Sequence, residues 1–194
     1  NSATLRSPLL LVMNGSNARI SNSIFFNNIG SYSGGGGIYV RESDLTVINC
    51  TFSANIAYRG GAILKDNAVG ILTLTNCILH GNTATNLGNE LFRYTGGANQ
   101  EPVITYTDIQ GGWTGTGNID ADPLFNNAGN GDLSLQPVSP CIDMGKPDTT
   151  GLGIPPQDLA GLPRVAITAI DMGAYELQGI PCGIIAKDST WSAD

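Results

Sequence analysis

The stretch LTVINCTFSAN at residues 45–55 returns 27 residues later as LTLTNCILHGN at 72–82, and ARISNSIFFNN at 18–28 precedes it at the same spacing. Up to its first Asn, each copy alternates apolar and polar residues with a period of two, which is typical of a β-strand. Repeats of roughly 20 to 50 residues indicate a solenoid or propeller, because one copy cannot bury its own apolar face. A 27-residue unit is too short for a propeller blade of about 40 residues. The repeat therefore predicts a parallel β-helix with one copy per rung.

Asn recurs at two positions of every copy, where the predicted strands bend. Asn tolerates a left-handed backbone, and its amide can form hydrogen bonds along a stack of rungs. We therefore predict two structural ladders, which consist of Asn22, Asn49 and Asn76 and of Asn28, Asn55 and Asn82.

Charge and proline are unevenly distributed along the 194 residues, whose net charge is −7. Residues 1–107 carry six Lys/Arg against five Asp/Glu, whereas residues 108–194 carry three against eleven, and eight of the ten Pro lie at or after Pro123. We expect regular rungs over 1–110 and an irregular, loop-rich cap over 111–178, since the last rung of a solenoid needs a cover. The acidity argues against nucleic acid as a partner, and no apolar run approaches the roughly 20 residues of a membrane span, so we expect no membrane insertion.

The four cysteines fall into two pairs. Cys50 and Cys77 share a repeat position and are expected to stack as buried thiols on neighbouring rungs, because parallel in-register side chains point poorly at one another. Cys141 and Cys182 lie in the loop-rich part, where we predict a disulfide. Such a bridge indicates an oxidising, extracytoplasmic location.

Two sets of motifs resemble known bacterial families. The repeat elements GGAI (60–63), FSAN (52–55) and FFNN (25–28) resemble those of polymorphic outer-membrane proteins and of right-handed parallel β-helix surface proteins. The second half resembles the choice-of-anchor Q domain through five motifs in order, NIDADPLF (118–125), DLSL (132–135), SPCIDMG (139–145), DLAGLPR (158–164) and DMGAYE (171–176).

The resemblance implies a place near the C-terminus of a secreted bacterial β-helix protein, just before a cell-surface anchor. Residues 179–194 are similar to the linker or opening strand of a following unit, so we expect a piece of a longer protein. The predicted fold is all-β, a right-handed parallel β-helix of four or five rungs with an irregular C-terminal cap. Within that cap, the motif residues Arg164 and Asp171 are expected to form an ion pair.

Few residues carry a chemical signal. Asp120 and Asp122 are a candidate Ca²⁺ ligand pair, although carboxylates just before Pro123 also cap backbone amides in turns. His80 is the only histidine, and the spacing gives it no partner, so we predict no catalytic residue. Apart from Ca²⁺, the sequence indicates no cofactor.

These observations favour a secreted, adhesin-like structural module at the bacterial cell surface, with a glycan, another cell-surface component or other units of the same protein as its partner. A fragment of a polysaccharide lyase or glycoside hydrolase is the first alternative. A structural subunit of an extracellular filament or surface layer is the second. The sequence leaves the question of enzymatic activity open and favours its absence.

Overall fold

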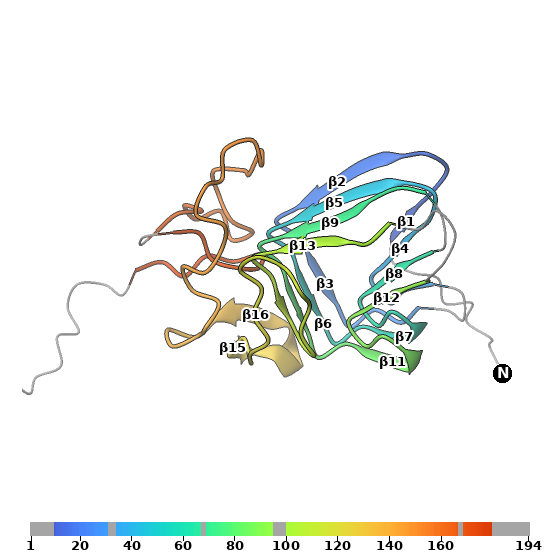
Figure 1. The fold of residues 1–194 in the computed structure, drawn as a ribbon. Coiled ribbons are helices and arrows are strands. Elements are labelled where there is room, and N and C mark those ends of the chain that lie inside the picture. The colour runs from blue at the N-terminus through green and yellow to red at the C-terminus, as the bar shows by residue number, and fades with distance from the viewer. Residues whose placement is uncertain (1–9, 31–33, 67–68, 95–99, 167–168, 180–194) are drawn as a thin grey trace, which may run out of the picture.

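The chain forms a parallel β-helix in which successive turns stack their strands into three four-stranded parallel sheets (Figure 1). The computed structural model describes residues 10–30, 34–66, 69–94, 100–166 and 169–179. The solenoid makes about three full turns. Each of the three main sheets stacks four strands, which is the lower end of the four or five rungs predicted, and the chain leaves the stack after the strand that ends at Ile109.

The three sheets have equivalent strands in each turn. The first contains β1 (Leu10–Val12), β4 (Ile38–Val40), β8 (Ile63–Lys65) and β12 (Leu91–Arg93). The second contains β2 (Asn17–Ser21), β5 (Asp44–Ile48), β9 (Leu72–Thr75) and β13 (Val103–Thr105). The third contains β3 (Ile24–Phe26), β6 (Thr51–Ser53), β10 (Ile78–His80) and β14 (Asp108–Ile109), and β7 (Ile56–Arg59) pairs with β11 (Thr83–Leu87).

The repeat sets the register and the core. Leu45 and Leu72 are aligned in neighbouring strands, as are Val47 and Leu74, and all four side chains are fully buried. In the third sheet the rings of Phe25 and Phe52 stack with centroids 4.5 Å apart. Each turn thus completes the apolar core of the turn beside it, which one copy could not do alone.

The first Asn position forms the corner between the second and third sheets. Asn22, Asn49 and Asn76 have positive φ angles of 47°, 49° and 54°, a backbone region that Asn adopts more readily than most residues. Their side-chain partners lie in the C-terminal cap rather than along the stack. This set is therefore a corner that contacts the cap, not the ladder that the repeat suggested.

The second Asn position forms a continuous ladder. Asn28 donates from its Nδ2 to Asn55 Oδ1 at 2.7 Å, and Asn55 donates from its Nδ2 to Asn82 Oδ1 at 2.7 Å. The same oxygens accept the backbone amides of Asn28 and Asn55. Asn82 donates in turn to the two carboxylate oxygens of Glu90, from its backbone N–H at 3.1 Å and from its side-chain Nδ2 at 2.5 Å. Glu90 thus ends the ladder.

The cap begins after β14 and covers the outer face of the third sheet (Figure 1). Its only described strands, β15 (Phe125–Asn127) and β16 (Asp132–Leu135), form an antiparallel hairpin joined by a 3-10 turn at Ala128–Asn130. A second apolar cluster joins Ile78 of the solenoid to Leu135, Cys141 and Met172 of the cap. The cap and the solenoid therefore share a core.

We expect Asn55→Ala to lower the free energy of unfolding by about 2–4 kcal/mol, because it removes a side chain from the middle of the ladder and leaves buried polar partners unpaired. Chemical denaturation measures the change. Asn130→Ala, at an exposed position of the 3-10 turn, is the matched control and should change stability by less than about 0.5 kcal/mol. Equal effects of the two substitutions would contradict the ladder's role.

Candidate functional site

A cleft of about 420 Å³ lies between the outer face of the third sheet and the β15–β16 hairpin. The solenoid contributes one wall and the cap the other. The lining residues are Ser53, Ala54, His80, Gly81, Asp122, Leu124, Phe125, Ala128, Gly129 and Gln136. The cleft therefore exists only where the cap folds back on the stack.

Strand alternation positions the residues on the solenoid side. Ser53 and His80 are register partners on β6 and β10. Their neighbours Phe52 and Leu79 are fully buried in the core. Because successive side chains of a strand point to opposite faces, Ser53 and His80 face outward into the cleft.

The hairpin wall is shaped by turns. Asp122 accepts the amide of Leu124 at 2.9 Å through Oδ1, and Leu124 has a φ of 51°. This turn directs the chain into β15, where Phe125 packs partly against the second apolar cluster. Gly131, with a φ of 81°, closes the hairpin against the ring of Phe26, where a β-carbon would come within 3.0 Å of that ring.

His80 offers one usable nitrogen to the cleft. Its Nδ1 is buried and has no hydrogen-bond partner. A buried N–H without a partner costs more than a buried lone pair, so of the two neutral tautomers the one with its proton on Nε2 fits this environment better. The imidazole therefore presents an N–H donor at Nε2.

The lining of the cleft differs from the arrangement of carboxylates that glycosidases use. Glycosidases place two carboxyl groups on either side of the scissile bond, whereas Asp122 is the one carboxylate among the described residues of the lining. Asp108 lies behind this surface and is fully buried. It accepts the amide of Ala121 at 3.1 Å and the thiol of Cys141 at 3.4 Å. These contacts hold the cap to β14.

The structure gives the predicted Ca²⁺ ligands backbone partners. Asp120 accepts the amide of Gly111 at 3.1 Å, and Asp122 accepts that of Leu124. Among the described residues there is no group of three or more His, Cys, Asp or Glu side chains that could hold a metal ion. The two carboxylates thus cap turns, the alternative that the sequence left open.

The cysteines of the described segments are free thiols. Cys50 and Cys77 are completely buried on neighbouring turns, and burial raises the pKa of both thiols. Cys141 is also buried, and its pKa is raised by burial and by Asp108. Its expected disulfide partner Cys182 lies outside the described residues, so that pairing stays a prediction.

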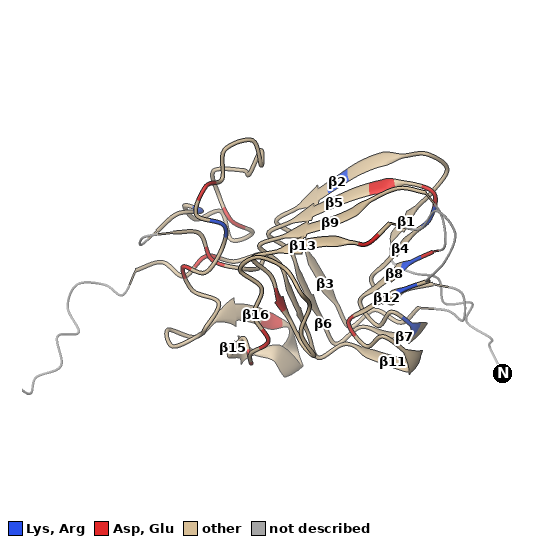
Figure 2. Cartoon of the chain, viewed as in Figure 1, with Lys and Arg blue, Asp and Glu red and all other residues tan. Residues whose placement is uncertain are grey.

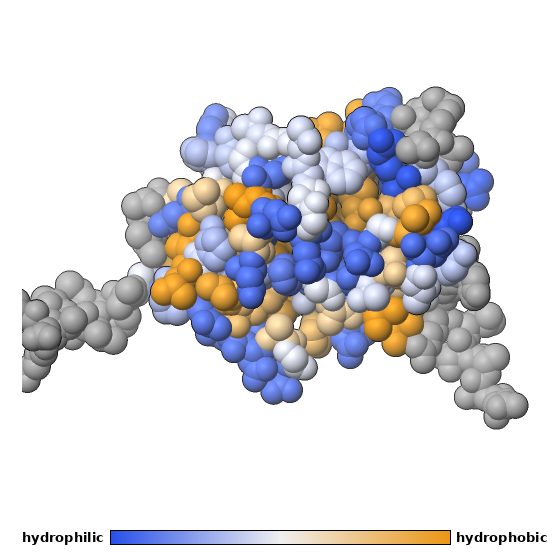
Figure 3. Space-filling model, turned by 60° about the horizontal axis from the view of Figure 1, so that its bottom comes forward, coloured by the Kyte–Doolittle hydropathy of each residue, from blue (hydrophilic) through white to orange (hydrophobic). Residues whose placement is uncertain are grey.

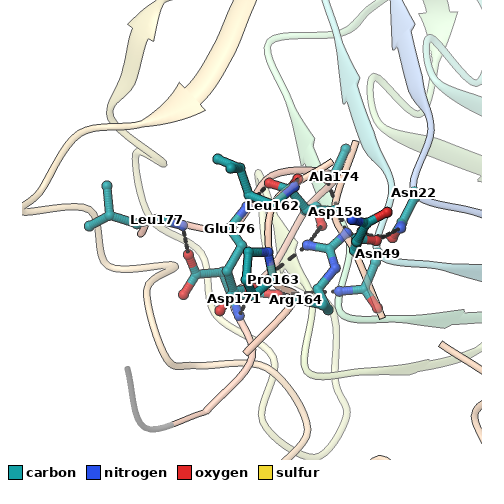
Figure 4. Close-up of polar contacts among 12 residues, drawn as sticks. Asn22, Asn49, Asp158, Leu162, Pro163, Arg164, Asp171, Ala174, Glu176 and Leu177 are labelled. Carbon is teal, nitrogen blue, oxygen red and sulfur yellow. Dashed lines mark hydrogen bonds and ion pairs between the residues drawn. The ribbon is translucent and has the colours of Figure 1, made fainter. Parts of the chain in front are cut away.

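Arg164 joins the cap to the first turn of the solenoid (Figure 4). The buried guanidinium donates to Asn22 Oδ1, to the carbonyl of Gly173 at 3.3 Å and to that of Ala174 at 3.0 Å. Its ion pair is with Glu176, at 3.7 Å between Nη1 and Oε2. The predicted partner was Asp171, and this was wrong, because the Asp171 carboxylate accepts the amides of Asp143 and Leu177.

The cap also binds the corners of the next two turns. Asn49 donates from Nδ2 to the carbonyl of Asp171 at 3.3 Å. Asn76 accepts the amide of Lys146 at 2.7 Å through its side chain and that of Gly173 at 2.8 Å through its carbonyl. One irregular segment therefore binds three successive corners.

Arg164→Met should destabilise the protein by about 3–5 kcal/mol, because it leaves the buried Glu176 and the carbonyls of Gly173 and Ala174 without their donor. Chemical denaturation measures the change, and limited proteolysis should show earlier cleavage within the cap. Arg41→Met is the control. The Arg41 side chain is 47% exposed in its pair with Glu42, so the Arg41→Met substitution should lower the free energy of unfolding by less than about 1 kcal/mol. A cap as protease-resistant as that of the unmodified protein would contradict this role of Arg164.

Two buried glutamates have raised pKa values. Burial, opposed by the hydrogen bonds from Asn82, raises the pKa of Glu90 from 4.5 to about 7. Burial also raises the pKa of Glu176, and its effect outweighs the opposing charge of Arg164. Glu90 was not singled out from the sequence. Glu90 follows Gly88 by two residues, and in this repeat such a glycine precedes a strand. This spacing was the signal for a buried position.

Because the pKa of Glu90 is 4.5 when unfolded and about 7 when folded, the folded state binds the proton more tightly. Its contribution to stability is fully present below the lower value and is lost as the pH rises through the higher one. The free energy of unfolding should therefore be greater near pH 5 than near pH 8.5, by up to about 3 kcal/mol from Glu90.

Denaturation across this pH range measures the slope, and Glu90→Gln should reduce it. The carboxylate of Glu101 is 67% exposed, so Glu101→Gln should leave the slope unchanged. A slope that survives Glu90→Gln at full size would rule out Glu90 as its source.

Aromatic residues on the outside of the solenoid hold an arginine. The Arg59 guanidinium lies 5.3 Å from the ring centroids of Tyr58 and Tyr94 and 5.6 Å from that of Phe92. These distances indicate cation–π contacts. The three half-buried rings thus form a cluster around this arginine.

Comparison with known proteins defines the class. A family model described as the right-handed β-helix region matches residues 7–115, which is 109 of the 194 residues. The chain therefore belongs to the right-handed β-helix family, and the predicted all-β, right-handed fold is confirmed. No curated protein and no solved structure matches the chain. Within the described segments, no helix is long and apolar enough to span a membrane.

Proposed function

We propose that the chain is a structural, adhesin-like module of a secreted bacterial surface protein, of the choice-of-anchor Q type, and that it has no catalytic role. A solenoid is a stiff rod with long lateral surfaces, because its stability comes from contacts between neighbouring turns. Such a rod can project a binding surface without a cofactor. Its partner would be a glycan or another cell-surface component, or a further unit of the same protein.

The observation that carries the proposal is the attachment of the cap across three successive corners of the solenoid. The charged residues of the motifs that resemble the choice-of-anchor Q domain fix the cap itself, and Arg164 also binds Asn22 of the solenoid. Asp158 accepts the amides of Leu162 and Glu176, each at 2.9 Å. Asp171 and Arg164 are likewise engaged in buried contacts. Motif residues used in this way support a structural role.

The distribution of charge and apolar surface supports the same role. Charges of both signs are spread over the molecule: Asp and Glu lie in the cap, on β5 and beside β13, and Lys and Arg lie on β2, β7, β8 and β12 and in the cap (Figure 2). On the face shown in Figure 3, apolar residues form separate patches divided by polar ones. A surface of this kind suits a module that is exposed to water.

The proposal predicts that display of the chain on a non-adherent bacterium increases attachment to a glycan-coated surface or to neighbouring cells. The comparison strain displays Arg164→Met, whose cap attachment is weakened. Purified chain should bind glycans of an array, with and without Ca²⁺, and leave them uncleaved during incubation. Cleavage of a bound glycan would favour the lyase or hydrolase alternative. Unchanged attachment together with a silent array would overturn the adhesive role.

A further inference from the structure

We infer that the cleft between the third sheet and the hairpin binds a neutral sugar ring. This inference rests on the proposed adhesive function and locates sugar binding in this cleft. The cleft's volume of about 420 Å³ lies within the roughly 300–1,000 Å³ that is usual for small-molecule sites. One or two sugar rings fit this space.

The polar groups of the cleft match a polyol. Asp122 uses Oδ1 for the amide of Leu124 and keeps lone pairs on Oδ2 to accept a hydrogen bond. His80, with Nδ1 buried and unpartnered, presents Nε2–H as a donor. The Ser53 hydroxyl can donate or accept a hydrogen bond. A ligand must therefore donate on the hairpin side and accept on the solenoid side. Neighbouring hydroxyls of a sugar ring do both.

The rest of the lining is apolar or small. Leu124 and Phe125 form the hairpin wall, and Ala128 and Gly129 form its rim. A β-carbon added at Gly129 would have only Asn127 Oδ1 near it, at 3.9 Å, so the rim is open. The C–H face of a pyranose can lie against such a wall while its hydroxyls reach the polar groups.

Charge selects against acidic sugars. Asp122 is charged, and the described lining contains no Lys or Arg. A uronate or a phosphorylated sugar would meet like charge without a cation to offset it. The ligand is therefore a neutral sugar.

The test is to titrate sugar probes into the full 194-residue chain and to monitor their binding by NMR and by calorimetry. The neutral probes are glucose, galactose, mannose and N-acetylglucosamine with their short oligomers, and the acidic probes are glucuronate and galacturonate. At least one neutral probe should shift the His80 ring signals and the amides of residues 124–136. The corresponding uronate should bind at least about tenfold more weakly.

Three variants locate the site, and one serves as the matched control. His80→Leu removes the donor and should weaken binding about tenfold. Asp122→Asn keeps the oxygen that accepts the Leu124 amide and should weaken binding severalfold, while Ala128→Tyr should fill the rim and abolish it. Asp132→Asn is the control, because Asp132 accepts the Ser134 amide in the same way but lies outside the lining. It should bind as the unmodified chain does.

The outcomes separate this inference from the proposed function. Equal binding by all four variants, or tighter binding of uronates, would overturn the cleft as a neutral-sugar site while leaving adhesion intact. Absence of binding by every probe, although displayed chain still promotes attachment, would also overturn the inference alone. Loss of both attachment and sugar binding from the unmodified chain would overturn both. Folding of each variant is checked by its amide spectrum.

Discussion

The solenoid depends on one backbone constraint: the chain must turn sharply between the second and third sheets in every coil. The left-handed φ angles of Asn22, Asn49 and Asn76 make this turn. The same side chains then stand on the outer corner, where they bind the cap. At the equivalent place in the last coil, Tyr106 adopts a φ of 49° and packs partly against the shared core. The corner residue thus changes where the repeat gives way to the cap.

The second Asn set satisfies a different requirement, because a buried amide ladder needs an acceptor at its last donor. Each Asn oxygen accepts from the coil before it, so the ladder has a direction. Asn82 has no further Asn beyond it, and Glu90 supplies two oxygens instead. Burying that carboxylate costs free energy, which is visible in its raised pKa. Stability and its pH dependence therefore arise at the same residue.

The 27-residue period was sufficient to predict the strands, the inward columns and the corner positions, since stacking repeats one local environment. It could not identify the partner of Arg164, because the cap has no period and Asp171 and Glu176 are equally plausible by spacing. It also could not place His80 and Asp122 in one cleft, since they lie 42 positions apart in the sequence and only folding brings both to the same lining.

A regular solenoid presents nearly the same surface at each turn, so its own faces offer little that is unique to one coil. The cap breaks this regularity. Where the hairpin folds over the third sheet, Ser53 and His80 acquire a facing wall, and their register partner Phe26 on β3 lies against Gly131 of the hairpin. A distinctive concave site therefore arises at the seam between the periodic and the aperiodic parts. The contacts of Arg164 and the Asn corners, by fixing the cap, also fix the shape of that seam.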